Sequence, residues 1–541
     1  MSLRTVLMAL GSALLASPSA SPPEALSTYA IELRSNEGGL DVRGSAVFPP
    51  LESDTGSFAI LLSPLARDPR WSFRCNGRRL NIPASSNSEE GGDRRWILRL
   101  RQTCPAGSVA MIGFRYRLEA GTAAPQLRVA AESGFAGGGG ELWYPQRSFA
   151  ERQRGRIVLD LPAGLAAIAT GALQRQDRTG GRQRFLFETS GPAKLAFAYG
   201  PYSEARIGSP SPLTILSTGT PEQAADLARN LAPRIDALER AFGPAPFRSL
   251  ALVEIDFQSR VLGTSEYGMI FSDPSKMRGA FDGPYWAHEF GHQWWGVGIR
   301  PVSASPGAAL LTEGLSQFGA LLALEAVDGA AAAADYRRNG SGGSKAGSLA
   351  LYRELLRAGQ DRPMAAFLPQ GAEEILLAHQ LATTKGAIVL RYLAALAGAG
   401  RVNALLAEFF ARHAGGRVAW ADVEAALDRG TDGEFRWFLD QWLHGTAAPS
   451  VSVRYCIAGS RVRGEVHQPE AAIRLPLPVE MTGAWGSVRA LVRAEGRSSR
   501  FNLPAPGPVD AVRFDPDAVV PTASFAAGTH CPASGRAAEG R

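Results

Sequence analysis

The pattern of hydrophobic and polar residues changes twice along this chain. From about residue 27 to 205, short runs alternate apolar with polar residues and are separated by Gly, Pro, Asn and Asp. Strands at this spacing predict an all-β sandwich. From about 220 to 445 apolar residues recur every three or four positions, which predicts helices. From 450 to about 520 the short alternating runs return, so we expect a small second β-sandwich.

Two punctuated stretches mark the borders of these regions. Pro, Ser and Gly cluster at 207–212, and Ala-Ala-Pro stands at 447–449. A chain of 541 residues is also too long for one ordinary hydrophobic core. We therefore expect a multidomain α+β protein with an N-terminal β-sandwich at 21–206, a mainly helical domain at 207–447 and a C-terminal β-sandwich at 448–535.

The helical region divides into several predicted elements. Thr220-Pro-Glu opens a run that ends at Gly243, and a strand is expected at 250–256. A further helix is expected between Pro284 and Gly296. The remaining predicted helices cover 308–327, 345–358, 385–398, 402–413, 420–428 and 433–443.

Composition narrows the possible functions. Apolar residues make up 45% of the chain and charged residues 20%, which is typical of a folded protein. The 57 basic and 51 acidic residues leave a net charge of +6, with no run of five like charges. We expect no nucleic-acid partner, because no basic surface with interleaved aromatic residues is indicated.

The amino terminus and the cysteines indicate an exported protein. Arg4 precedes an apolar run of about eleven residues and a small-residue exit, which predicts a signal peptide at 1–20. No later segment offers eighteen uninterrupted apolar residues, so no integral membrane segment is expected in the mature chain, which would be periplasmic or secreted. Two local disulfides are expected, Cys75 with Cys104 and Cys456 with Cys531, although four cysteines allow three connectivities and free buried thiols are the alternative.

The most informative motif is His288-Glu289-x-x-His292. On a helix, residues four apart lie on one face, so two imidazoles can grip one metal ion. Glu289 projects beside them, where its carboxylate can take a proton from water. The alternative is a core helix that carries two histidines by coincidence. With seven His in 541 residues, the probability of a chance match to this motif is on the order of half a percent.

Two histidines leave a catalytic zinc site one protein ligand short. Glu313, twenty-one positions after His292, stands near the start of the next predicted helix, which can pack antiparallel to the first. An acid at the start of an apolar helix can also serve only the helix dipole. Beside the two histidines, the ligand interpretation is preferred, and we expect one Zn²⁺.

These residues resemble a known family. His288-Glu-Phe-Gly-His-Gln-Trp-Trp-Gly296 followed by Thr312-Glu313-Gly314 is similar to the aminopeptidase N-like gluzincins. The resemblance implies a β domain, a thermolysin-like catalytic domain and, in short forms, a small β domain. The long helical carboxy-terminal domain of larger members has no counterpart here, which implies a more open site.

The resemblance also implies roles for single residues. His288, His292 and Glu313 match the zinc ligands, and Glu289 matches the general base. Gly263-Thr-Ser-Glu266-Tyr267 resembles the family's exopeptidase motif, in which the Glu pairs with the free α-amino group of the substrate. Here the family's Met is replaced by Ser265.

One departure concerns the oxyanion donor. Family members place a Tyr two residues before a Lys-Gly pair, and this chain has Thr383 before Lys385-Gly386. Loss of one such donor costs about a hundred- to a thousand-fold in rate. His379 and Tyr285 are candidate replacements, and His379 is otherwise a surface or packing residue.

Three functions compete on this evidence. The first is an exported zinc aminopeptidase that acts on peptides with a free N-terminus. The second is a metal-binding but catalytically weak protein whose β domains bind a peptide or partner, a hypothesis motivated by Thr383. The third is an endopeptidase that makes no use of Glu266.

Overall fold

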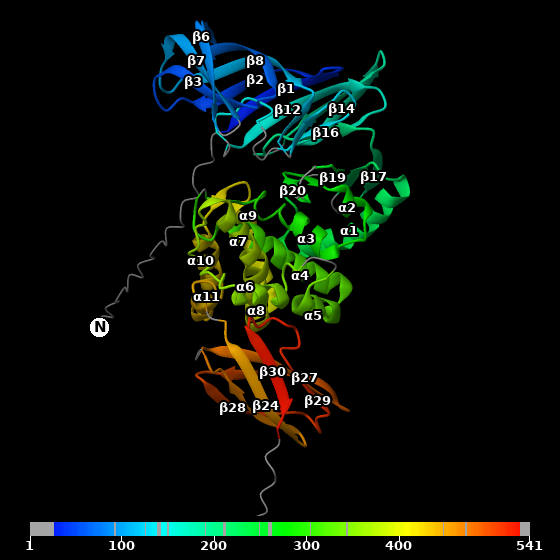
Figure 1. The fold of residues 1–541 in the computed structure, drawn as a ribbon, viewed down its shortest axis with the longest axis vertical. Coiled ribbons are helices and arrows are strands. Elements are labelled where there is room, and N and C mark those ends of the chain that lie inside the picture. Colours follow the sequence, from blue (N-terminus) through cyan, green and yellow to red (C-terminus); the bar gives the residue numbers. More distant parts are fainter. Residues whose placement is uncertain are drawn as a thin grey trace, which may run out of the picture.

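The computed structural model describes residues 26–530, with gaps at 91–92, 125, 138–141, 149–150, 190, 209–211, 248, 258–261, 303, 342–344, 447 and 471–472. Figure 1 shows three parts stacked along the long axis: a β part at one end, helices in the middle and a second β part at the other end. The expected signal peptide at 1–20 lies outside the described residues.

The N-terminal part contains three sheets among the described residues. The largest has eight strands in the order β14 (Ala172–Thr179), β15 (Arg182–Glu188), β12 (Gln153–Pro162), β1 (Ser27–Asn36), β2 (Gly39–Pro50), β8 (Val109–Glu119), β4 (Ala66–Cys75) and β5 (Arg78–Leu80). The second has five, β13 (Ala166–Ala169), β16 (Phe197–Gly200), β11 (Gly134–Ala136), β10 (Leu127–Val129) and β9 (Gly121–Ala124). The third has β3 (Thr55–Leu62), β7 (Asp93–Cys104) and β6 (Ala84–Glu90).

Alternating residues explain this packing. In β1 the apolar side chains of Tyr29, Ile31 and Leu33 are buried while their neighbours face solvent. A two-residue period of this kind covers one face of a sheet with core. The expected Cys75–Cys104 disulfide is present. Cys531 lies outside the described residues, so its expected pairing stays a prediction.

The central part begins with a mixed sheet. Its order is β17 (Ser203–Ile207), β18 (Leu213–Ser217), β19 (Leu250–Glu254), β21 (Met269–Ser272) and β20 (Gly263–Glu266). The three inner strands run parallel, and β20 pairs antiparallel with β21 at one edge. The expected border at 206/207 falls inside β17. One core cluster joins this sheet to Phe135 and Ala198 of the N-terminal part.

Helices fill the rest of the central part. They are α1 (Pro221–Phe242), α2 (Pro274–Arg278), α3 (Gly283–Gly291), α4 (Leu315–Asp328), α5 (Ala330–Asn339), α6 (Leu349–Arg357), α7 (Gly371–Leu381), α8 (Ala387–Ala397), α9 (Ala399–His413), α10 (Trp420–Gly430) and α11 (Arg436–Trp442). Two π-helical turns, Leu310–Gly314 and Ala382–Gly386, precede α4 and α8. A short ladder joins β22 (Arg300–Pro301) to β23 (Arg417–Val418).

The structure departs from the expected helices at four places. Helices α2, α5 and α7 are additional to the expected set. The expected helix from Pro284 to Gly296 ends at Gly291, and turns follow. Trp294 and Trp295 are both fully buried: both rings pack on Phe242, and in addition Trp294 packs on Phe247 and Trp295 on Phe410. Adjacent residues of a straight helix point about 100° apart, so turns suit this double burial better.

The C-terminal part holds two small sheets among the described residues. One has the order β28 (Ser498–Pro504), β25 (Arg461–His467), β24 (Ser450–Ala458), β30 (Ser524–Thr529), and the other β27 (Gly486–Ala494), β26 (Leu475–Gly483), β29 (Ala511–Phe514). Their apolar faces belong to the same core cluster as the helices, from Leu213 to Val520. The helical and C-terminal parts therefore share one core.

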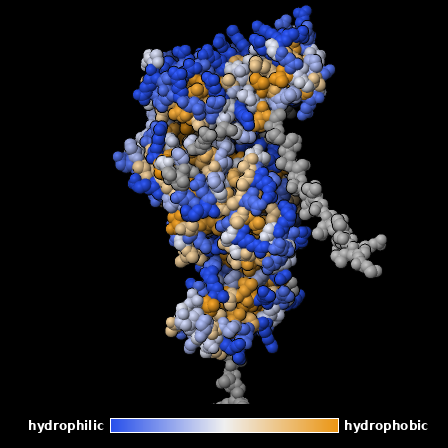
Figure 2. Space-filling view, turned by 180° about the vertical axis from the view of Figure 1, so that it is seen from behind, coloured by the Kyte–Doolittle hydropathy of each residue, from blue (hydrophilic) through white to orange (hydrophobic). Residues whose placement is uncertain are grey.

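Surface and hydropathy add two observations. Figure 2 shows a face that is mostly hydrophilic over the N-terminal part, with hydrophobic patches there and on the other two parts. Within the described residues, Leu310–Asp328 has the length and hydropathy of a membrane span, but 67% of its apolar window is buried inside the protein. That burial matches a core helix, since its neighbours already cover it.

Candidate metal centre and active site

Helix α3 carries the two histidines and starts at a well-defined cap. The Asp282 side chain accepts a hydrogen bond from the Tyr285 backbone N–H. The same carboxylate forms an ion pair with Lys276 at 2.7 Å. Pro284 lies in the first turn, where its missing N–H removes no helical bond. His292 follows the last helical residue in helical conformation and donates its backbone N–H to the carbonyl of His288. The two imidazoles therefore lie one turn apart, as the sequence predicted.

Glu313 comes from the π-helical turn Leu310–Gly314, directly before α4. Such turns insert one extra residue per turn and are frequent at functional sites. Helix α3 approaches α4 closely at Gly291, where a Cβ atom would lie only 2.9 Å from the carbonyl oxygen of Ser316. A glycine at this position lets the two backbones come close enough for Glu313 to reach the histidines.

The three side chains converge on one point. The Nε2 atoms of His288 and His292 are 3.1 Å apart, and Oε2 of Glu313 lies 3.3 Å from the first and 3.5 Å from the second. With zinc–ligand bonds of about 2.0–2.1 Å, a tetrahedron separates neighbouring ligand atoms by about 3.3 Å. The three measured separations therefore match three corners of a tetrahedral zinc site.

The hydrogen-bond pattern fits a metal as well. Oε2 of Glu313 is buried and has no hydrogen-bond partner, although imidazole nitrogens lie within 3.5 Å of it. Lone pairs of metal ligands point toward the metal and not toward one another. A buried carboxylate oxygen without a hydrogen bond is therefore what a zinc ligand would show when the ion is absent. The side chains of His288, His292 and Glu313 keep 12, 15 and 19% exposure, so packing does not seal the cluster.

The charges of the cluster are strongly coupled. Burial disfavours the protonated form of His292, but the Glu313 carboxylate outweighs burial and raises the pKa of His292 to about 9. Burial alone would raise the pKa of Glu313, whereas the facing imidazoles hold that pKa well below its usual value. In the absence of metal, a proton on His292 thus takes the place of a cation.

Neighbouring groups orient His292. Its Nδ1 lies 3.1 Å from the Trp295 carbonyl oxygen and 3.1 Å from the Ser316 hydroxyl. With Nδ1–H donated to the carbonyl, the Nε2 lone pair is left for the metal, a common arrangement around metal-binding histidines. Ser316 belongs to α4, so the helix that follows Glu313 also fixes the second histidine.

Glu289 lies beside the ligands, as the motif predicts. It is 9% exposed, and the Ser265 hydroxyl contacts both its backbone carbonyl at 3.0 Å and its Oε2 at 3.3 Å. Strand β20 passes close by, because a Cβ on Gly263 would come within 2.9 Å of the Glu289 carboxylate. The candidate base is therefore held between α3 and the edge strand.

Glu266 ends that edge strand and is 6% exposed. Gln293, the residue after His292, donates to the Glu266 carbonyl at 3.0 Å and accepts from the Gly268 N–H at 2.9 Å. One buried amide thus ties the β20–β21 turn to the metal-binding segment. Burial lowers the pKa of Arg152, a residue of the N-terminal part, to about 10, and the negative charge of Glu266 opposes this shift. Arg152 in turn donates to the carbonyls of 296 and 297.

The three candidate oxyanion donors differ in where their polar atoms go. The buried Thr383 hydroxyl donates to the His379 carbonyl at 3.0 Å, so it is used inside its own helix. The Tyr285 hydroxyl lies 2.9 Å from the Leu262 carbonyl and 3.0 Å from Ser272. Nδ1 of His379 lies 3.3 Å from Oε2 of Glu313, so this residue lies beside the candidate ligands.

Several of these residues escaped sequence reasoning. Ser265 was noted only as a departure from the family motif, and Gln293 and Ser316 were given no role. Their contacts cross between β20, α3 and α4, so spacing along one element does not reveal them. The Gln directly after the second histidine was the one local signal, because a buried amide must find partners.

Comparisons with known proteins bear on the fold. No protein-family model matches this sequence, and no curated protein matches it. An M1 zinc metallopeptidase from Deinococcus radiodurans is similar in structure, with a TM-score of 0.60 and 16% identity over 79% of this chain and 95% of that one. A mutant from the same organism, bound to a Tyr-Ser-Ala substrate, gives a TM-score of 0.58 at 16% identity, over 79% of this chain and 95% of that one.

A third similar structure is longer than this chain. Legionella pneumophila aminopeptidase A in complex with aspartic acid gives a TM-score of 0.64 and 13% identity, over 93% of this chain and 59% of that one. These likenesses show a mixed α/β fold shared with M1 zinc metallopeptidases. They agree with the expected combination of helices and β-sheets.

Proposed function

We propose that this protein is a zinc-dependent aminopeptidase that removes N-terminal residues from peptides. The observation that carries the proposal is that ligand atoms of His288, His292 and Glu313 converge at three corners of one tetrahedron, partly open to solvent, with Glu289 beside it. Closed four-ligand sites are structural, whereas three protein ligands with an open position are typical of catalysis.

Zinc held by these three residues would supply Lewis acidity and make a water more acidic. Glu289 then takes a proton from that water, which adds to the carbonyl carbon of the first peptide bond. The same carboxylate returns the proton to the leaving nitrogen as the C–N bond breaks. The contact from Ser265 keeps the Glu289 carboxylate in place during both transfers.

We assign Glu266 as the group that binds the free α-amino group of the substrate. Its support is position: β20 is the edge strand next to α3, and Ser265 within it contacts the base. An anion that binds the α-amino group at a fixed distance from the reacting carbonyl selects the first peptide bond for cleavage. The N-terminal part at 21–206, whose Arg152 contacts the loop after α3, would close this side of the site.

The catalytically weak alternative was motivated by Thr383. Its hydroxyl is committed to the helix, so this alternative depends on whether another donor serves the site. The endopeptidase alternative differs in making no use of Glu266. We also propose that the protein is exported, which N-terminal sequencing of the mature chain in its native host would test.

An aminoacyl-arylamide series assayed with the zinc-loaded protein separates the three functions. The aminopeptidase hypothesis predicts turnover that is lost on chelation and in Glu289→Gln, and retained in Glu37→Gln, a control at an exposed turn. No turnover with one tightly bound zinc would favour the weak binder. Turnover of N-blocked peptides at rates equal to free ones would favour the endopeptidase.

A further inference from the structure

His379 brings a third imidazole to the candidate metal centre. It lies on α7, and its Nδ1 is 3.3 Å from Oε2 of Glu313. Its side chain is 51% exposed, far more than those of the three candidate ligands. Ile375 and Leu376, four and three residues earlier on the same helix, are 59% exposed each. This stretch of α7 thus presents one imidazole and two apolar side chains to solvent beside the site.

The geometry argues against two structural roles for His379. Among the described residues, only His288, His292 and Glu313 have ligand atoms that all lie within 4.8 Å of one another, so His379 is outside the ligand set. Its Nδ1 lies within ion-pair distance of Oε2 of Glu313, but its ring N–H makes no hydrogen bond to that oxygen. An imidazole that is half exposed beside the candidate ligands, and whose N–H is not used by them, is available to the substrate.

We propose that His379 is a catalytic residue that donates a hydrogen bond to the carbonyl oxygen under attack; this inference rests on the proposed function. As the water oxygen bonds to the carbonyl carbon, the π electrons of the C=O bond move onto its oxygen. The His379 N–H stabilises that negative charge without giving up its proton. When the C=O bond re-forms, the C–N bond breaks and the amine leaves with the proton from Glu289. Fixed donors of this kind are worth about a hundred- to a thousand-fold in rate.

The test compares His379→Phe, which keeps a ring but removes the N–H, with His379→Gln, which keeps an N–H donor. His467→Phe, on an exposed position of β25, is the matched control. We expect kcat to fall about a hundred- to a thousand-fold in the Phe variant, with KM changed less than about threefold and one zinc still bound. The Gln variant should recover part of the loss.

A binding measurement gives a second readout that does not depend on turnover. A phosphinic dipeptide, which mimics the tetrahedral oxyanion, should bind the Phe variant about a hundred-fold more weakly, while a free amino acid binds as before. Equal analogue affinity, or loss of zinc from the Phe variant, would overturn the proposal. If the natural protein hydrolyses no peptide, the proposed function fails, and the analogue affinities still decide the role of His379.

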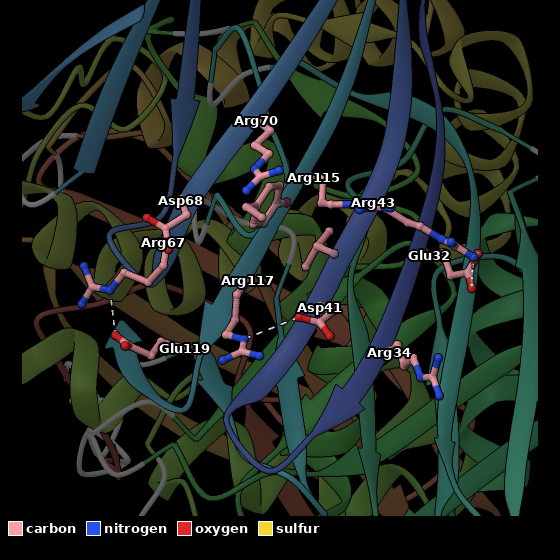
Figure 3. A pocket seen from close by; sticks show the side chains of 12 residues that line it. Glu32, Arg34, Asp41, Arg43, Arg67, Asp68, Arg70, Arg115, Arg117 and Glu119 are labelled. Carbon is pink, nitrogen blue, oxygen red and sulfur yellow. Dashed lines mark hydrogen bonds and ion pairs between the residues drawn. The ribbon is translucent and has the colours of Figure 1, made fainter.

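A separate observation concerns the exposed face of the eight-stranded sheet. A hollow of about 690 Å³ there is lined by six arginines and four carboxylates (Figure 3). Arg43, Arg115 and Arg70 stand directly opposite one another on β2, β8 and β4. Like charges in cross-strand register destabilise a sheet. The row ends at a bulge in β4, where Asp68 adopts a positive φ of 48°.

The carboxylates of this hollow pair with only one arginine of the row, Arg43, which lies 2.9 Å from Glu32. Outside the row, Glu119 pairs with Arg67 at 2.7 Å and Asp41 with Arg117 at 3.5 Å. Within the described part of the chain, Arg70 and Arg115 have no carboxylate partner, and Figure 3 shows both extending from neighbouring strands over the hollow. Two unpaired guanidinium groups and a formal surplus of two positive charges favour a dianion as the ligand. A single carboxylate can form a bidentate contact with only one of the two guanidinium groups.

We infer that this hollow binds a phosphate group. Inorganic phosphate, and vesicles with and without a phosphomonoester lipid, are titrated against the full chain at constant ionic strength. The Arg70→Gln/Arg115→Gln double variant should lose affinity at least about tenfold, whereas Arg175→Gln, an exposed arginine of β14 that pairs with Asp177, should not. Binding only to the vesicles identifies a lipid headgroup as the source. Equal binding by both variants, or none by the natural protein, would overturn the inference.

Discussion

At the scale of single residues, the candidate chemistry depends on few contacts. That His288 and His292 lie together was predictable, because spacing of four on a helix puts them on one face whatever the rest of the fold. That Glu313 joins them was predictable only beside the two histidines. The Ser265 contact and the His379 placement were not, since each depends on how separate elements pack.

Zinc affinity should depend on pH through His292. Its pKa of about 9 lies above the usual 6.5, so the metal-free site holds a proton that zinc must displace. Affinity should rise about tenfold per pH unit up to about pH 9 and then level off. In the metal-free protein this proton stabilises the fold fully below pH 6.5, and the contribution is lost as pH rises through 9. Calorimetry in two buffers counts the released protons, and release of none at pH 7 would contradict the account.

Replacing Ser265 tests how the base is held. Ser265→Ala removes a hydrogen bond to Glu289 worth about 0.5–1.5 kcal/mol, so kcat should fall about two- to tenfold with zinc content unchanged. Ser487→Ala, at an exposed strand position, is the control. Steady-state kinetics at saturating zinc gives kcat for both variants. An unchanged kcat for Ser265→Ala would show that the contact between Ser265 and Glu289 does not contribute to catalysis.

At the scale of elements, the patterns that bury one face were predictable and the others were not. Helices α1 and α4 follow their apolar residues closely. Helix α7 was missed because Ile375 and Leu376 face solvent instead of the core, which breaks the expected stripe. The π-helical turn that carries Glu313 was also missed, because nothing in the local sequence distinguishes it from an ordinary helical turn.

The approach of α3 to α4 is open to test at Gly291. A Cβ there would lie 2.9 Å from the Ser316 carbonyl, so Gly291→Ala should destabilise the protein by about 1–3 kcal/mol and weaken zinc binding. Gly400→Ala, on α9 with no atom within 4 Å of the added carbon, should instead stabilise by about 0.4–1 kcal/mol. Denaturant unfolding measures both, and equal effects would refute the close-approach argument.

At the scale of the whole molecule, the change from strands to helices and back to strands was predictable from the sequence, but the packing between these regions was not. The helices and the C-terminal sheets share one core, and buried Arg337 donates to the Asp517 carbonyl at 2.6 Å across their junction. The alternation of apolar and polar residues along a strand indicates which face of the sheet is buried, but it does not indicate which element packs on that face. The C-terminal part therefore supports the helices that surround the site.

This junction should make the two parts unfold together. Arg337→Met leaves a buried carbonyl without its donor, so stability should fall by about 1–3 kcal/mol in a single transition. Arg412→Met, which removes an exposed pair with Glu408, should change stability by less than about 0.5 kcal/mol. Scanning calorimetry distinguishes the cases, and a separate early transition of the C-terminal part would contradict the shared core.

X-ray absorption spectroscopy of the zinc-loaded protein tests the central claim most directly. The account predicts one zinc per chain with two imidazole nitrogens, one carboxylate oxygen and one further oxygen that exchanges with an added inhibitor. Four protein ligands with nothing exchangeable, or no bound zinc at all, would contradict it.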